Sequence, residues 1–173
     1  MALEPATTFK SLLNGPLQDY SLAWTGSDEA ICHVGTGLHK VPLARLQDIF
    51  LSIGRDSLSG KSKTFTLLEV IRILGPFPNV RNTLQGSITD IRANSDDKIK
   101  AKIKYETMVD GLGKEITAGN EDDSRQFDLN VLYADQYALV LTTENGFGEG
   151  GKNILLFLKE DDLDSTLDGL RAS

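Results

Sequence analysis

Residues 98–105 read Lys-Ile-Lys-Ala-Lys-Ile-Lys-Tyr, and this stretch indicates the fold class. Apolar and basic residues alternate without interruption, which predicts a strand over residues 99–109 with one apolar and one basic face. The apolar face carries Ile99, Ala101, Ile103 and Tyr105. The basic face carries Lys98, Lys100, Lys102 and Lys104.

Segments of similar character lie on both sides of this strand. Strands are predicted over residues 20–24, 29–34, 64–74, 84–92, 126–133, 137–143 and 153–159. Helices are predicted over residues 7–14, 42–53 and 161–171. In 42–53, Pro42 fits a first helical position and apolar residues recur three or four apart.

Short strands at this spacing predict a mainly β, α+β fold: an antiparallel sandwich or barrel with flanking helices. A closed barrel is favoured because strands this apolar are an aggregation hazard as exposed edges. The 173 residues are expected to form one domain. Within it lie an N-terminal helix and strand region (1–62), a β-rich core (63–159) and a C-terminal helix (160–173).

Composition excludes several functional classes. A net charge of −7 argues against binding duplex nucleic acid. The single cysteine, Cys32, excludes an intramolecular disulfide framework and any cysteine-based zinc site. The longest apolar run, residues 154–158, is too short for a spanning helix. The N-terminus lacks the features of a signal or transit peptide, so the protein works where it is made or the numbering begins at a mature or trimmed form.

Several motifs suggest chemistry but lack its structural context. Residues 146–151 match the dinucleotide pattern G-x-G-x-x-G, yet a predicted strand follows where that motif needs a helix. Residues 54–62 resemble a phosphate-binding loop with one residue too many between the glycines. The acidic runs 121–123 and 160–162 lack calcium-loop spacing.

A nucleophile pair of Cys32 with His39 or His33 is conceivable. In a strand over 29–34, however, the adjacent Cys32 and His33 point to opposite faces and cannot act together. A buried structural cysteine is the simpler interpretation. We therefore expect no enzyme activity, no catalytic residue and no bound metal.

The four-lysine face has two interpretations. Like charges on one strand face repel each other, so an anionic partner such as lipid headgroups or an acidic protein would stabilise them. Alternatively, this is a barrel's solvent face whose neighbouring strands supply Asp and Glu. On the first interpretation, the membrane or partner surface comprises Lys98, Lys100, Lys102, Lys104 and Phe77.

Two segments resemble the plastid lipid-associated proteins, the fibrillin family of chloroplasts and cyanobacteria. Residues 74–86, Leu-Gly-Pro-Phe-Pro-Asn-Val-Arg-Asn-Thr-Leu-Gln-Gly, are similar to that family's G-P-F-P-N-V-R-N-T-L-x-G segment. Residues 131–140 and 151–158 resemble its closing pattern of two strands around a glycine-rich loop. Together the segments cover about 40 residues in the expected order.

The resemblance implies a lipocalin-like barrel that binds a quinone, carotenoid or acyl lipid without catalysis. It also implies a plastid location, peripheral to thylakoids or in plastoglobules. No cofactor is required, and the partners are a hydrophobic small molecule and a membrane or thylakoid complex. A barrel of this size has room for one ligand if its inward residues leave space. The candidate ligand-binding residues are Ile103, Tyr105, Phe127, Leu129, Val131 and Tyr133.

The alternative is that these side chains close-pack and leave no cavity. The protein would then be a structural or assembly subunit docked on a thylakoid photosynthetic complex.

Overall fold

The computed structural model describes residues 5–93, 99–110, 114–117, 125–143 and 152–171. In chain order, the helices are α1 (Pro5–Asn14), α2 (Asp28–Val34), the 3-10 helix η1 (Leu38–Lys40) and α3 (Leu163–Arg171). The strands are β1 (Gln18–Thr25), β2 (Ala44–Gly54), β3 (Thr64–Ile73), β4 (Val80–Ala93), β5 (Ile99–Val109), β6 (Glu115–Thr117), β7 (Arg125–Ala134), β8 (Ala138–Thr143) and β9 (Ile154–Glu160).

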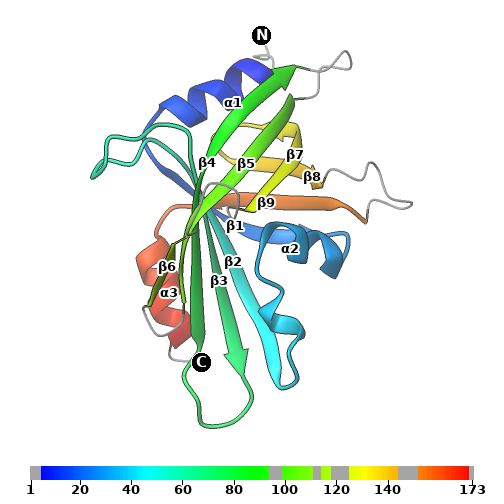
Figure 1. The fold of residues 1–173 in the computed structure, drawn as a ribbon, viewed down its shortest axis with the longest axis vertical. Helices are drawn as coiled ribbons and strands as arrows, with labels where there is room; N and C mark the ends of the chain where they lie inside the picture. Colours follow the sequence, from blue (N-terminus) through cyan, green and yellow to red (C-terminus); the bar gives the residue numbers. More distant parts are fainter. Residues whose placement is uncertain (1–4, 94–98, 111–113, 118–124, 144–151, 172–173) are drawn as a thin grey trace.

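Eight of the strands close into an antiparallel barrel (Figure 1). Their order is β4-β3-β2-β1-β9-β8-β7-β5, and pairing of β4 with β5 completes the ring. The short β6 adds to β5 outside the ring. The prediction of a mainly β, closed antiparallel barrel with flanking helices is therefore confirmed. The N-terminal region contributes β1 and β2 to the barrel wall.

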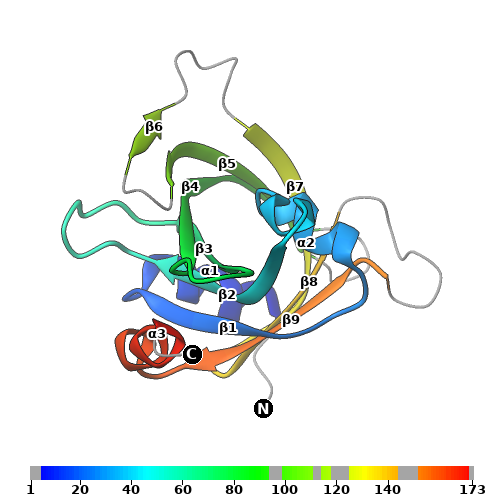
Figure 2. The same ribbon diagram turned by 90° about the horizontal axis from the view of Figure 1, so that it is seen from below.

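A helix covers each end of the barrel (Figure 2). α1 contacts β2 and β7, which lie on opposite sides of the ring, and it buries Phe9 and Leu13. α2 lies at the other end and contributes Ala30, Ile31 and Val34 to the same hydrophobic core. The barrel interior and both helices thus form one continuous apolar core.

Residues 42–53 are not the predicted helix, because β2 occupies Ala44–Gly54. A register shift between Leu46 and Asp48 explains the misleading spacing. The bulge brings Leu46 and Ile49, three residues apart, to the same core, whereas Ile49, Leu51 and Ile53 follow with the period of a strand. Apolar residues on both sides of the bulge therefore imitate a helical period.

Residues 29–34 are not the predicted strand, because they form α2. Ser27 is its N-cap, and the Ser27 hydroxyl accepts a hydrogen bond from the backbone N–H of Ala30. Asp28 and Glu29 follow in the first turn, where carboxylates favour a helix. Ser27 and Asp28, which lie between the two predicted strands 20–24 and 29–34, thus begin a helix.

The segment that carries the clearest family resemblance holds α3 in place. Asn79 donates a hydrogen bond to the Leu170 carbonyl at 2.8 Å, and Arg81 donates to the Leu167 carbonyl at 2.9 Å. Both therefore satisfy carbonyls at the C-terminal end of α3. Within the described ranges, no helix has the length and apolar character needed to cross a membrane.

Candidate functional site

The inward faces of β5 and β7 form a paired apolar wall. Ile103 lies opposite Phe127, and Tyr105 lies opposite Arg125. Five of the six predicted ligand-binding side chains are at most 8% exposed and belong to the core cluster: Ile103, Tyr105, Phe127, Leu129 and Val131. Their predicted inward orientation is confirmed.

Tyr133 does not face the interior. Its exposed fraction is 46%, and its hydroxyl donates to Asp135 Oδ2 at 2.6 Å. The cause is a register shift in the pairing of β7 with β8 between Val131 and Tyr133. The shift ends the alternation, so Ala134 is buried after Tyr133 and the tyrosine lies outside.

Side chains fill the interior at the α2 end. The rings of Tyr105 and Phe127 lie 5.3 Å apart between centroids, and Phe65 lies 6.2 Å from Tyr105. His33 of α2 makes an edge contact with Phe127 at 5.3 Å. Three hollows in the described part of the chain are lined by residues outside this wall. Where these rings pack together, a ligand would have to displace side chains.

α2 is attached to the barrel by side chains of three different strands. The Tyr105 hydroxyl of β5 donates to the Val34 carbonyl at 2.6 Å. Arg125 of β7 donates to the carbonyls of Cys32, His33 and Gly35 at the C-terminal end of α2. Burial raises the pKa of the Tyr105 hydroxyl, so this group stays a donor at neutral pH.

Glu69 of β3 provides the third attachment. It is fully buried, and its two oxygens accept hydrogen bonds from the backbone N–H of Thr36 at 2.7 Å and the Thr36 hydroxyl at 2.5 Å. Gly35 permits this approach, because a Cβ there would lie 1.9 Å from Glu69 Oε1. We call residues 28–40, which include α2 and η1, the cap.

Sequence reasoning missed both charged attachment residues. Glu69 was identifiable as the one acidic residue within an apolar strand, residues 64–74. Arg125 offered no comparable signal, because it stands at the exposed start of β7. Neither sequence position reveals that the two side chains meet the cap.

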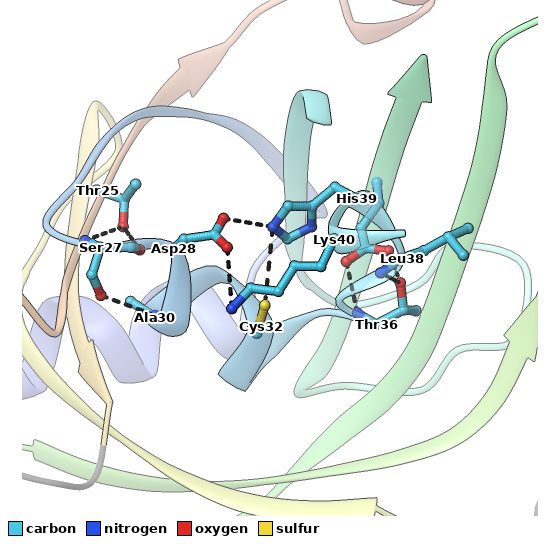
Figure 3. Close-up of polar contacts among 10 residues, drawn as sticks. Thr25, Ser27, Asp28, Ala30, Cys32, Thr36, Leu38, His39 and Lys40 are labelled. Carbon is cyan, nitrogen blue, oxygen red and sulfur yellow. Dashed lines mark hydrogen bonds and ion pairs between the residues drawn. The ribbon is translucent and has the colours of Figure 1, made fainter. Parts of the chain in front are cut away.

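A polar cluster lies on the cap itself (Figure 3). His39 Nε2 lies 2.6 Å from Asp28 Oδ1 and 3.9 Å from Cys32 Sγ. Lys40 Nζ lies 3.3 Å from Asp28 Oδ2. Burial raises the pKa of Asp28, but hydrogen bonds from His39 and Lys40 outweigh it, so the net pKa is below the usual value. Burial raises the pKa of Cys32, which favours the thiol.

The lysine face meets carboxylates on both neighbouring strands. Lys100 Nζ lies 3.0 Å from Asp128 Oδ2 of β7, and Lys102 pairs in register with Asp128 and with Asp90 of β4. A surface hollow is lined by Asp90, Arg92, Lys100, Lys102 and Asp128. This matches the interpretation as a solvent face with acidic neighbours. Lys98 lies outside the described residues.

A second apolar surface lies on the outside of the barrel. Tyr133 of β7, Val140 of β8, Leu156 of β9 and Trp24 of β1 are successive cross-strand partners, so they form one row across four strands. Tyr133 is 46% exposed and Trp24 51%. Phe77, predicted to contact a membrane or partner, is also exposed.

The motif at 146–151 and the acidic run 121–123 lie outside the described residues. Comparison of the chain with protein-family models, curated proteins and solved structures gives no match.

Proposed function

We propose that this protein is a non-enzymatic, plastid lipid-associated protein that holds one hydrophobic metabolite in its barrel, at the surface of thylakoids or plastoglobules. The location and the ligand class, a quinone, carotenoid or acyl lipid, rest on the resemblance of residues 74–86, 131–140 and 151–158. One structural observation supports the proposal. Ala30, Ile31 and Val34 of the cap fill one end of the barrel, and the strands around them contribute apolar side chains to the same core.

Displacement of the cap would expose an apolar interior of the kind that such a ligand needs. The cap is attached by side-chain hydrogen bonds from Tyr105, Arg125 and Glu69. Each such bond contributes only about 1–3 kcal/mol, and α2 buries three apolar side chains in the core, Ala30, Ile31 and Val34. We therefore expect the cap to open at a lower free energy than the strand ladder. A bound metabolite would replace the apolar contacts that Ile31 and Val34 make in the closed state.

Uptake of a short-chain plastoquinone analogue by the isolated protein tests this. Tyr105→Phe removes the hydroxyl that bonds to Val34 and keeps the ring, so we expect about 2- to 10-fold faster uptake. Ile31→Ala should also increase uptake because it empties space in the cap. Leu13→Ala in α1 is the matched control, since it removes buried apolar volume at the opposite end. If neither the unmodified protein nor any of these three variants takes up the analogue, the proposal is contradicted.

A second candidate function is that of a docked assembly subunit with a filled core. The outer apolar row of Tyr133, Val140, Leu156 and Trp24 favours it. The occupant would be a protein complex, because a chain of net charge −7 is repelled by anionic lipid headgroups.

Co-sedimentation with thylakoids separates the surfaces. Trp24→Ser with Tyr133→Ser should release the protein, whereas Lys100→Glu, Lys102→Glu and Lys104→Glu together should leave it bound. Release by the lysine variant alone would identify the lysine face as the docking surface and would contradict this candidate.

A further inference from the structure

Three different metal-ligand side chains meet on the cap. Asp28 and Cys32 lie one turn apart on the same face of α2, and His39 reaches them from η1. Their ligand atoms, Asp28 Oδ1, Cys32 Sγ and His39 Nε2, all lie within 4.8 Å of one another. Figure 3 shows the three side chains converging from two separate turns of the chain.

The arrangement does not fit a catalytic triad. In a triad, the carboxylate bonds to one ring nitrogen of the histidine and the nucleophile to the other. Here Asp28 Oδ1 and Cys32 Sγ both approach the same nitrogen, Nε2. His39 is 7% exposed, and its Nδ1 is buried without a hydrogen-bond partner in the described ranges. All polar contacts of the ring are thus directed into the cluster.

Convergence on one point is the arrangement that a metal ion requires. Around tetrahedral zinc, bond lengths of about 2.0–2.3 Å separate neighbouring ligand atoms by roughly 3.3–3.6 Å. The observed separations from Nε2, 2.6 Å to Asp28 Oδ1 and 3.9 Å to Cys32 Sγ, lie on either side of this range. Small side-chain rotations would therefore accommodate an ion.

The donor set indicates which ion fits. Thiolate with imidazole favours zinc, whereas magnesium and calcium favour oxygen ligands alone. Lys40 contacts the other carboxylate oxygen, Oδ2. An ion would therefore take the place of the hydrogen bond between Oδ1 and His39 Nε2 without displacing Lys40. We propose that Asp28, Cys32 and His39 bind one Zn²⁺ ion, with water as the fourth ligand. This proposal departs from the expectation that a single cysteine excludes any such site, because the cap places a His and an Asp beside Cys32.

Binding must release the proton of the Cys32 thiol to solvent, because the thiolate is the ligand. The hydrogen that His39 Nε2 shares with Asp28 must also leave that nitrogen, so the bound imidazole carries its proton on Nδ1. The ion would link α2 to η1 and so hold the cap in its closed form. This consequence for ligand entry rests on the proposed function, but the metal site itself does not.

Titration of the full chain with Co²⁺, the spectroscopic substitute for zinc, tests the site. We expect one equivalent to bind with a thiolate-to-cobalt absorption band that Zn²⁺ abolishes. Cys32→Ser should eliminate the band, and His39→Gln should weaken binding at least about tenfold. Asp56→Asn is the control, because it changes a carboxylate in another loop. Absence of the band in the unmodified protein, or unchanged affinity in both ligand variants, overturns the proposal.

A second measurement needs no substitution. Saturating Zn²⁺ should slow alkylation of Cys32 by iodoacetamide at least about tenfold, since a coordinated thiolate is a poorer nucleophile than a free one. An equal alkylation rate with and without Zn²⁺ would contradict the site. Neither measurement involves quinone uptake, so failure of the proposed function leaves this test intact.

Discussion

The two ends of the barrel are closed by different kinds of contact. At one end, α1 inserts Phe9 and Leu13 into the core, and the Leu13 carbonyl accepts a hydrogen bond from the backbone N–H of Lys63. At the other end, the cap also buries Ala30, Ile31 and Val34 in the core. In addition, charged side chains of the strands, Glu69 and Arg125, hold it by hydrogen bonds. Apolar burial fixes a helix whatever the pH, whereas polar attachments can be broken one at a time. We therefore propose that the cap, whose attachment includes polar bonds that can break one at a time, is the end that opens, while α1 stays in place.

The largest expected effect comes from the α1 end. Phe9→Ala removes a ring that is 2% exposed in the core, so the free energy of unfolding should fall by about 3–5 kcal/mol. Denaturant unfolding, followed by tryptophan fluorescence and circular dichroism, measures this loss. We expect one cooperative transition by both probes. If Phe9→Ala lowers the free energy of unfolding by less than the cap variant Gly35→Ala does, the comparison between the two ends is reversed.

An intermediate effect is expected at the cap. Gly35→Ala places a methyl group where Glu69 Oε1 lies, so Glu69 must turn away and lose its bonds to Thr36. The expected loss of stability is about 2 kcal/mol. Gly169→Ala in α3 is the matched control, because its Cβ meets nothing within 4 Å and alanine favours a helix by about 1 kcal/mol. Equal destabilisation by both substitutions would show that Glu69 does not attach the cap.

The smallest expected effect is a dependence on pH that the cap shows and α1 does not. The folded pKa of Asp28 lies below its ordinary value of 3.8, so its stabilising contribution is present above that pH. The contribution is lost as the pH falls through the folded value. Hydrogen-exchange protection of residues 28–40 should therefore decrease in acid more than that of 5–14. α1 contains no carboxylate side chain.

Asp28→Asn should reduce this difference, because it removes the carboxylate whose pKa is lowered in the folded cap. Protection factors corrected for intrinsic exchange, measured at pH 7 and pH 3, provide the test. If residues 28–40 and 5–14 of the unmodified protein lose equal protection between pH 7 and pH 3, Asp28 is not the cause of the acid sensitivity.

Regular alternation made most of the barrel predictable. β5 begins and ends at the residues that the pattern of 99–109 indicates, because no bulge interrupts it on the β7 side. Bulges caused two of the errors. They gave β2 a helix-like spacing and turned Tyr133 outward, and a bulge leaves no certain mark in a single sequence.

The candidate site was less predictable than the fold. The wall residues Ile103, Tyr105 and Phe127 follow from alternation alone. The cap does not, because its contacts join residues far apart: Thr36 and Glu69 are 33 positions apart, and Gly35 and Arg125 are 90. The hydrogen bond from the Tyr105 hydroxyl to the Val34 carbonyl of the cap is likewise visible only in the three-dimensional structure.

The most direct test of a displaceable cap is native-state hydrogen exchange of the full chain without ligand. The backbone amides of residues 28–40 should exchange through an opening at least about 2 kcal/mol below the opening that exposes α1. That result would show a cap that opens while the barrel stays folded. Equal opening free energies for residues 28–40 and 5–14, both matching global unfolding, would contradict the account.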